Sequence, residues 1–219
     1  MSRRQHLSFS IVVSLLCLAL PALAGPAVTF SSDSGVYLNG AAYTLGWEFS
    51  IAAPIQVTSL GFWDYLGNGF HTATGAPTTV DVGIWNAAQS LLASTSVSGT
   101  DTILNVLADG SGFRFDTLAI PLTLQPGTYY IGGTNHGTEA YESLVGSDAS
   151  YDPAVKWLSG AYWYGDTLTF PSTLDGNTPA GWFGPNFEMT GVPEPGTIGL
   201  LLLGSGLLAL LGRGRRSRT

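Results

Sequence analysis

Short apolar runs with polar residues at alternate positions recur between residues 25 and 191, and no long helical periodicity extends over this region. The runs are rich in β-branched and aromatic side chains, as in YTLGWEFSI and IQVTSLGFW. Alternation of this kind is typical of strands that bury one face. We therefore predict strands at residues 41–51, 55–63, 79–85, 91–97, 112–118, 120–124, 127–132 and 183–190.

Turn-forming residues separate the predicted strands. The clearest are Leu66-Gly67-Asn68-Gly69, Asp109-Gly110-Ser111-Gly112 and Gln125-Pro126-Gly127. Glycine, asparagine, aspartate and proline favour turns because each satisfies or restricts the backbone locally. Eight or more short strands joined in this way predict an all-β domain, an antiparallel β-sandwich with a jelly-roll-like order.

The first 24 residues have a different pattern from the body. Arg3 and Arg4 precede an apolar run at residues 9–20, which is followed by Ala22-Leu23-Ala24 and Gly25. A positive flank, a short apolar core and an A-x-A site are the parts of a secretory signal peptide. We predict that signal peptidase removes residues 1–24, and the arginine pair leaves the general secretory and twin-arginine routes open.

The last 28 residues form a second distinct segment, in three parts. Val192, Pro193, Glu194 and Pro195 precede an apolar run at about 197–212. Helical residues rise about 1.5 Å each, so this run covers about 25 Å, a short membrane span. The arginine-rich end, residues 213–219, holds the four residues Arg213, Arg215, Arg216 and Arg218. These should stop translocation and stay cytoplasmic, which predicts that the body lies outside.

This three-part end resembles the PEP-CTERM sorting signal, with V-P-E-P at 192–195, an apolar helix and a basic terminus. The resemblance implies recognition by an exosortase, a membrane transpeptidase that cleaves near Pro-Glu-Pro. It further implies a Gram-negative bacterium with an exopolysaccharide or biofilm matrix. The protein would be held in the inner membrane transiently and then reach the cell surface or the extracellular matrix. A permanent membrane anchor is the alternative.

Several phrases of the body, residues 25–191, resemble β-sandwich modules of bacterial surface proteins. They are LGWEF at 45–49, VTSLGF at 57–62, VGIWN with QSLLA at 82–93, LTLQPGTYYI at 122–131 and FGPNF at 183–187. These modules carry no established catalysis, so the resemblance implies a fold and no chemistry.

Charge is segregated along the chain. Six of the eight basic residues lie in the two end segments. The body keeps two basic residues, Arg114 and Lys156, against fourteen acidic ones, a formal net charge of −12. Nucleic-acid binding is excluded because the body lacks the basic patch that phosphate contacts require. The single cysteine, Cys17, lies in the predicted signal peptide, so the body contains no disulfide.

Motifs of catalysis are absent from the sequence. His71 and His136 are the only histidines outside the signal peptide, and no H-E-x-x-H, G-x-S-x-G, phosphate-loop or dinucleotide fingerprint occurs. We predict that the chain is not an enzyme and needs no cofactor. Calcium is the one metal that the acidic turns suggest, because it prefers carboxylate and carbonyl oxygens on loops. The candidate ligands are Asp101, Asp109 and Asp116, and solvated carboxylates are the alternative.

Aromatic residues concentrate late in the body. They are Trp157, Tyr162, Trp163, Tyr164 and Trp182. Such rings either fill a sandwich core or stack on sugar rings at the surface. Two functions follow. The first is a non-catalytic surface or extracellular-matrix protein processed by an exosortase, and the alternative is a carbohydrate-binding module of the exopolysaccharide matrix.

Overall fold

We analysed a computed structural model, which describes residues 24–32, 36–37, 40–139, 141–145, 148–175 and 180–192. The predicted signal peptide up to residue 23 and the sorting tail from residue 193 lie outside the described residues. The described part consists of antiparallel strands, which confirms the all-β prediction. Over this part of the chain no helix has the length and apolar character needed to cross a membrane.

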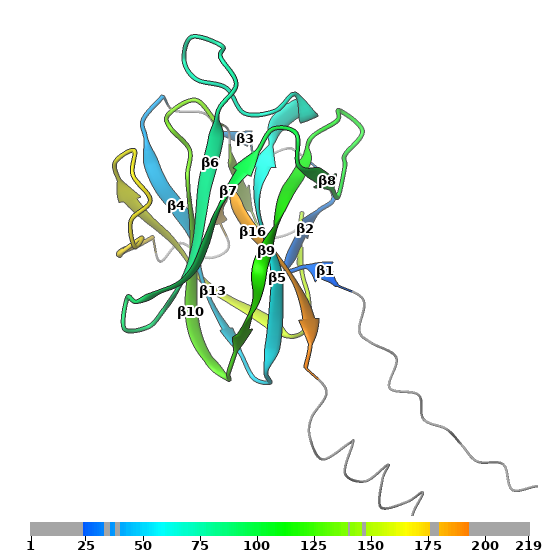
Figure 1. Ribbon diagram of the computed structural model, residues 1–219, viewed down its shortest axis with the longest axis vertical. Helices are drawn as coiled ribbons and strands as arrows, with labels where there is room; N and C mark the ends of the chain where they lie inside the picture. The colour runs from blue at the N-terminus through cyan, green and yellow to red at the C-terminus, as the bar shows by residue number, and fades with distance from the viewer. Residues whose placement is uncertain are drawn as a thin grey trace, which may run out of the picture. The chain divides into compact units, whose positions relative to one another are not determined.

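Two main sheets form the body (Figure 1). The larger sheet has the strand order β14 (Thr173–Leu174), β13 (Val155–Tyr164), β4 (Tyr43–Ile51), β10 (Gly127–Thr134), β6 (Thr79–Asn86) and β7 (Leu91–Ser98). The smaller has the order β1 (Gly25–Pro26), β16 (Pro185–Gly191), β5 (Ile55–Asp64), β9 (Gly112–Leu124) and β8 (Thr102–Leu104). The arrangement is consistent with the predicted β-sandwich, and the jelly-roll order stays a prediction.

Two minor sheets and one short helix complete the described part. They are β15 (Ala180–Phe183), β11 (Tyr141–Val145) and β3 (Val36–Tyr37), then β12 (Ala149–Tyr151) with β2 (Val28–Phe30), and the 3-10 helix η1 (Tyr65–Gly67).

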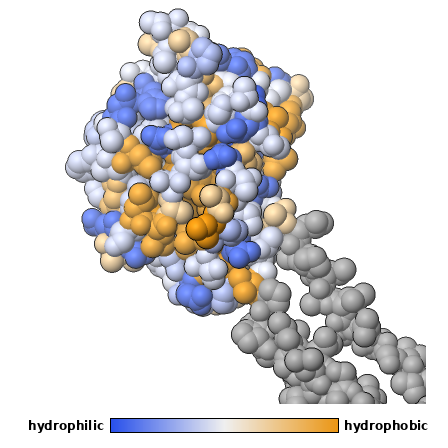
Figure 2. All heavy atoms as spheres, viewed as in Figure 1, coloured by the Kyte–Doolittle hydropathy of each residue, from blue (hydrophilic) through white to orange (hydrophobic). Residues whose placement is uncertain are grey.

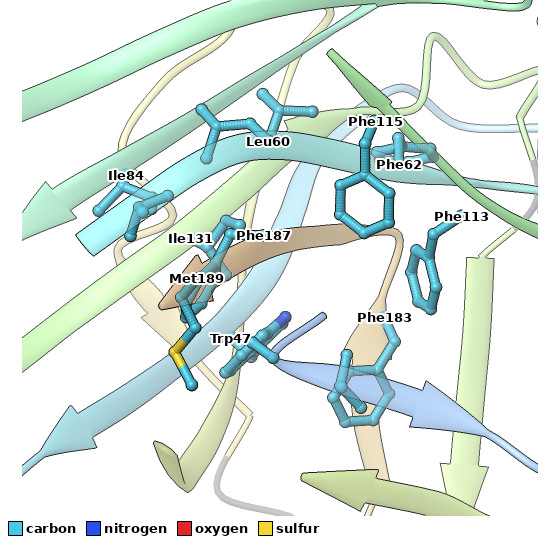
Figure 3. Packing of buried hydrophobic residues seen from close by; sticks show 14 of the residues in the cluster. Trp47, Leu60, Phe62, Ile84, Phe113, Phe115, Ile131, Phe183, Phe187 and Met189 are labelled. Atoms are coloured by element: carbon cyan, nitrogen blue, oxygen red, sulfur yellow. The ribbon is translucent and has the colours of Figure 1, made fainter. Parts of the chain in front are cut away.

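Alternate residues of β4 bury their side chains between the main sheets. Trp47 and Phe49 are fully buried, whereas Glu48 lies on the opposite face. The ring of Trp47 stacks on Phe187 of β16 at 5.8 Å between centroids, and its Nε1 donates to the Pro185 carbonyl at 3.0 Å. Figure 3 shows these rings together with Ile131 and Met189. Burial of large aromatic side chains therefore joins the two sheets.

One end of the body is formed by four turns and by the last residue of β16. We call it the tail end. The turns are residues 52–54, 87–90, 125–126 and 152–154. The opposite end, the far end, holds residues 65–78, 99–111, 135–139 and 165–172. In Figure 1 the long loop between β5 and β6 lies at the far end, and β16 points towards the tail end.

The chain enters the body beside the strand by which it leaves. Gly25 of β1 pairs with Met189 of β16, and Pro26 pairs with Glu188, in antiparallel register. The start of β1 and the end of β16 therefore share one edge of the smaller sheet.

Candidate functional site

The five aromatic residues predicted as a carbohydrate platform do not share one face. Tyr162 and Tyr164 of β13 lie on the same side, with ring centroids 5.7 Å apart, and Tyr43 lies 4.9 Å from Tyr164. Trp163 pairs with Thr44 and points to the other side of the sheet, because successive residues of a strand alternate. The cluster is therefore divided between the two faces of β13.

Burial divides the five residues further. Trp157, Tyr162 and Trp182 are partly buried and pack against the hydrophobic core. Trp182 lies over Gly160, where an added Cβ would come within 2.7 Å of its ring. Trp163 and Tyr164 remain 45% and 66% exposed. These two are the members that a ligand in solution could reach.

A second aromatic group lies on the outer face of the larger sheet and was not predicted. Trp85 of β6 is 4% exposed although its side chain points away from the core. Phe170 packs edge-on against Tyr130 at 4.9 Å and against Trp85 at 6.2 Å. The alternation of buried residues along β6 places Trp85 on the outer face of the sheet. A large apolar side chain at an outward position indicates that another segment covers this face, so the sequence of β6 did contain a signal for the cover.

The cover over Trp85 is the segment 165–172, which we call the strap. Thr44, fully buried, donates from Oγ1 to the Thr167 carbonyl at 3.2 Å and accepts from the Thr169 amide at 3.0 Å. His136 Nδ1 lies 2.5 Å from a carboxylate oxygen of Asp166. Hydrogen bonds to the buried Thr44 and to the partly exposed His136 thus fix the strap on the sheet.

Tyr130 and Glu48 form a hydrogen bond between neighbouring strands of this face. The Tyr130 hydroxyl donates to Glu48 Oε1 at 2.7 Å. Burial, and then the hydrogen bond to Glu48, raise the pKa of Tyr130 to about 12. The phenol therefore stays neutral and donating over the ordinary pH range.

The guanidinium group of Arg114 binds the oxygen atoms at the base of the acidic far end. Its Nε lies 2.5 Å from an oxygen of Asp64, which is 1% exposed, while Nη1 and Nη2 donate to the carbonyls of Asp101 at 2.9 Å and Gly67 at 3.1 Å. A guanidinium thus binds three oxygens of the kind that calcium prefers.

The three candidate calcium ligands are not brought together. Asp101 accepts from the Ser98 amide, Asp109 accepts from Ser111, and Asp116 accepts from Thr95. Among the residues that the structure describes, no three His, Cys, Asp or Glu side chains group as metal ligands. Asp101 and Asp109 therefore each support their own turn, and Asp116 of β9 links the smaller sheet to β7 of the larger sheet.

Glu139 is a buried carboxylate that anchors the loop before β6. Its Oε1 accepts from the His71 amide at 2.7 Å. Burial raises the pKa of Glu139, and the hydrogen bond from His71 offsets part of that rise. The two histidines outside the predicted signal peptide, His71 and His136, thus both take part in loop attachment.

The body ends where the sorting motif begins. The last strand, β16, finishes at Gly191, and the Val192 amide donates to the Pro54 carbonyl at 3.3 Å. The remaining motif residues and the four terminal arginines lie outside the described residues. At the other terminus Ala24 is exposed and Gly25 opens β1, while Ala22 lies outside the described part.

Comparison with known proteins identifies the C-terminal segment. The family model of the PEP-CTERM protein-sorting motif matches residues 191–216. This match confirms the predicted PEP-CTERM sorting signal. No curated protein and no solved structure matches the chain. The motif implies an exported protein that is sorted through the membrane, with an exosortase as its processing partner.

Proposed function

We propose that this PEP-CTERM protein is a non-catalytic component of the cell surface or extracellular matrix of a Gram-negative bacterium. An exosortase processes its tail at Pro193-Glu194-Pro195, and the β-sandwich body is the part that is delivered. The arginines from Arg213 onward hold the tail in the inner membrane until processing, and signal peptidase releases the other end at Gly25.

The observation that carries the proposal is the position of the motif relative to the body. The match starts at residue 191, which is the last residue of β16. Cleavage beyond Val192 would therefore remove no strand and no core residue from the described body. A delivered protein must stay folded after its tail is removed, and this junction supports that requirement.

The use of polar side chains within the fold supports a structural role. Asp64 neutralises Arg114, Glu48 accepts from Tyr130, and Thr44 holds the strap. These groups serve loops and strand pairs, whereas a catalytic group must be left available to a substrate. The body is accordingly a scaffold whose polar interactions maintain its shape.

The direct test replaces Pro193-Glu194-Pro195 with three alanines. Each proline restricts its predecessor to an extended conformation, so the change alters both the shape and the chemistry of the motif. We expect full-length protein to accumulate in the inner membrane, as measured by fractionation and intact mass. Deletion of residues 198–219 is the control and should release a soluble, unsorted body. Normal processing and localisation of the triple-alanine variant would falsify the sorting proposal.

Carbohydrate binding is a second candidate function, supported by the exposure of Trp163 and Tyr164. Exposed rings of this size are the usual contacts to the faces of sugars, and a polysaccharide matrix would provide the ligand. Trp163 and Tyr164 lie on opposite sides of β13, so one sugar-binding face would use one of the two rings. Binding of exopolysaccharide in a pull-down should therefore be lost in one of the variants Trp163→Ala and Tyr164→Ala at unchanged melting temperature. Leu174→Ala, another exposed apolar change, is the matched control. Equal binding by all three variants would remove this candidate.

A further inference from the structure

The two ends of the body differ in charge. The turns of the tail end contain one charged side chain, Asp152, and Lys156 follows as the second residue of β13. The far end contains Asp101, Asp109, Glu139 and Asp166, besides the Asp64–Arg114 pair at its base. Negative charge is therefore concentrated away from the end at which the sorting tail leaves.

Three of the four turns of the tail end are built from small, apolar or uncharged polar residues. They read Ala52-Ala53-Pro54, Ala87-Ala88-Gln89-Ser90 and Gln125-Pro126. Leu91 and Leu92 directly follow the second of these turns and are 50% and 37% exposed, and Ile120 of β9 is 84% exposed. Figure 2 shows apolar surface in the lower part of the face that β7 and β9 present in Figure 1.

The length of chain beyond the body limits its distance from a membrane. Four residues, 193–196, separate Val192 from the predicted apolar run that begins at about residue 197. Four extended residues span at most about 14 Å. The polar layer of a bilayer is itself about 5–8 Å thick on each side, so the tail end must lie at or near the headgroups.

We propose that the tail end is the surface with which the body rests on the lipid bilayer before processing. This inference relies on the proposed function, because it requires the uncleaved tail to be a membrane anchor. A leaflet with anionic lipids carries a negative potential that decays within about 10 Å, the Debye length. At the tail end one acidic turn residue, Asp152, lies close in sequence to Lys156, so this end carries little net charge. With its exposed leucine and isoleucine side chains it tolerates this layer, whereas the acidic far end is repelled from it. The asymmetry orients the body with its far end towards the surroundings.

The orientation is measurable with single labels, because the mature chain contains no cysteine once Cys17 is removed. A fluorophore is attached to Gln125→Cys at the tail end or to Ala76→Cys at the far end, both exposed positions. The chain of residues 25–219 is reconstituted in phosphatidylethanolamine vesicles, with or without phosphatidylglycerol, that contain headgroup-linked quencher lipids. We expect the label at Gln125→Cys to be quenched several-fold more strongly than the label at Ala76→Cys.

Added charge tests the electrostatic part of the argument. Ala53→Glu with Ala88→Glu should reduce quenching at Gln125→Cys in vesicles that contain phosphatidylglycerol, and less in vesicles without it. The matched far-end pair, Ala73→Glu with Ala76→Glu, should leave quenching at Gln125→Cys unchanged. All four alanines are exposed, so folding is expected to tolerate the changes.

Two results would overturn the proposal. One is equal quenching at both labels. The other combines two observations: the label at the tail end is not quenched in vesicles, and charge of either sign at this end slows tail cleavage in cells. The second is measured by comparing Ala53→Lys with Ala88→Lys against the glutamate pair. Equal slowing by both pairs would indicate that the tail end contacts the processing enzyme and not the bilayer. Sedimentation with the vesicles is recorded in each experiment. A chain that does not sediment contradicts the anchor of the proposed function, whereas one that sediments without differential quenching contradicts only the orientation.

Discussion

The hydroxyl group of Tyr130 joins β10 to β4 on the covered outer face of the larger sheet. Tyr130→Phe removes the donor to Glu48 and leaves this half-buried carboxylate without it. We expect the free energy of unfolding to fall by about 1–2 kcal/mol in urea denaturation. Tyr129→Phe is the matched control, because its hydroxyl donates to the carbonyl of the exposed Gln125, and it should cost less. Equal losses in both variants would contradict a specific role for the Tyr130 bond.

The raised pKa of Tyr130 also predicts how stability depends on pH. The pKa of this phenol rises from 10.0 to about 12 on folding, so the folded state holds its proton more tightly than the unfolded chain. The resulting stabilisation is complete below pH 10 and is lost as the pH rises to about 12. The difference in unfolding free energy between the native chain and Tyr130→Phe should therefore shrink over this interval. A constant difference from pH 9 to pH 12 would refute the linkage.

The Asp64–Arg114 pair is expected to respond strongly to loss of one partner. Arg114→Met leaves the buried Asp64 carboxylate without its cation, which should cost about 3–5 kcal/mol of unfolding free energy. Adding Asp64→Asn to this variant should restore part of the stability, because no uncompensated charge then remains. Strictly additive losses in denaturant titrations would show that the two groups act independently.

At the scale of single elements, the contribution of the strap to stability and to the burial of Trp85 can be tested. Phe170→Ala removes the ring that packs on Tyr130 and Trp85, and it opens the outer face to water. We expect a loss of about 1–3 kcal/mol and a red shift of tryptophan emission as Trp85 is hydrated. Leu174→Ala on the adjoining β14 is the control, with a change within about 0.5 kcal/mol. An unshifted emission spectrum in Phe170→Ala would indicate that the strap does not cover Trp85.

Strand positions with simple alternation could be predicted from the sequence, and those that depend on tertiary contacts could not. The predictions at 55–63 and 79–85 agree with β5 and β6 to within one residue. The two strands predicted at 112–118 and 120–124 are one strand, β9, whose register against β5 shifts between Val57 and Ser59. The strand predicted at 183–190 is divided at Gly184, where an added Cβ would come within 2.4 Å of Phe62.

The aromatic run of β13 shows why the site was harder to predict than the fold. Rings at both parities conceal the alternation, so the run was not predicted as a strand, although β13 extends from Val155 to Tyr164. Gly160 makes room for Trp182 through a contact between residues far apart in the sequence. The strap over Trp85 depends on Thr44, more than a hundred residues away. Periodicity assigns residues to faces, but it does not say which distant segment covers a face.

For the whole molecule, export should produce a mature chain that starts at Gly25. This residue opens β1 and pairs with Met189, so the predicted cleavage site coincides with the start of the described fold. N-terminal sequencing of exported protein checks the position. Retention of residues 1–24 in the exported material would contradict it, and a start beyond Pro26 would remove β1.

Calcium dependence is a further test on the intact body. A ligand that binds only the native state raises the melting temperature by mass action. Because Arg114 already occupies oxygens at the far end, we expect no rise in melting temperature on addition of calcium to the native chain. Magnesium at equal ionic strength controls for screening. A calcium-specific rise would restore Asp101, Asp109 and Asp116 as metal ligands.

The attachment of the tail to β16 determines how the body responds to mechanical load. In the proposed function a surface linkage replaces the tail, so drag on the body would reach the fold through Val192, at the end of β16. This strand pairs with β5 from Pro185 to Gly191 and with β1 on its other side. A pull along the axis of a strand loads its ladder hydrogen bonds in shear, all together, whereas a perpendicular pull breaks them one at a time. Under the proposed function, a load applied along β16 would therefore act in the direction in which the smaller sheet best resists tearing.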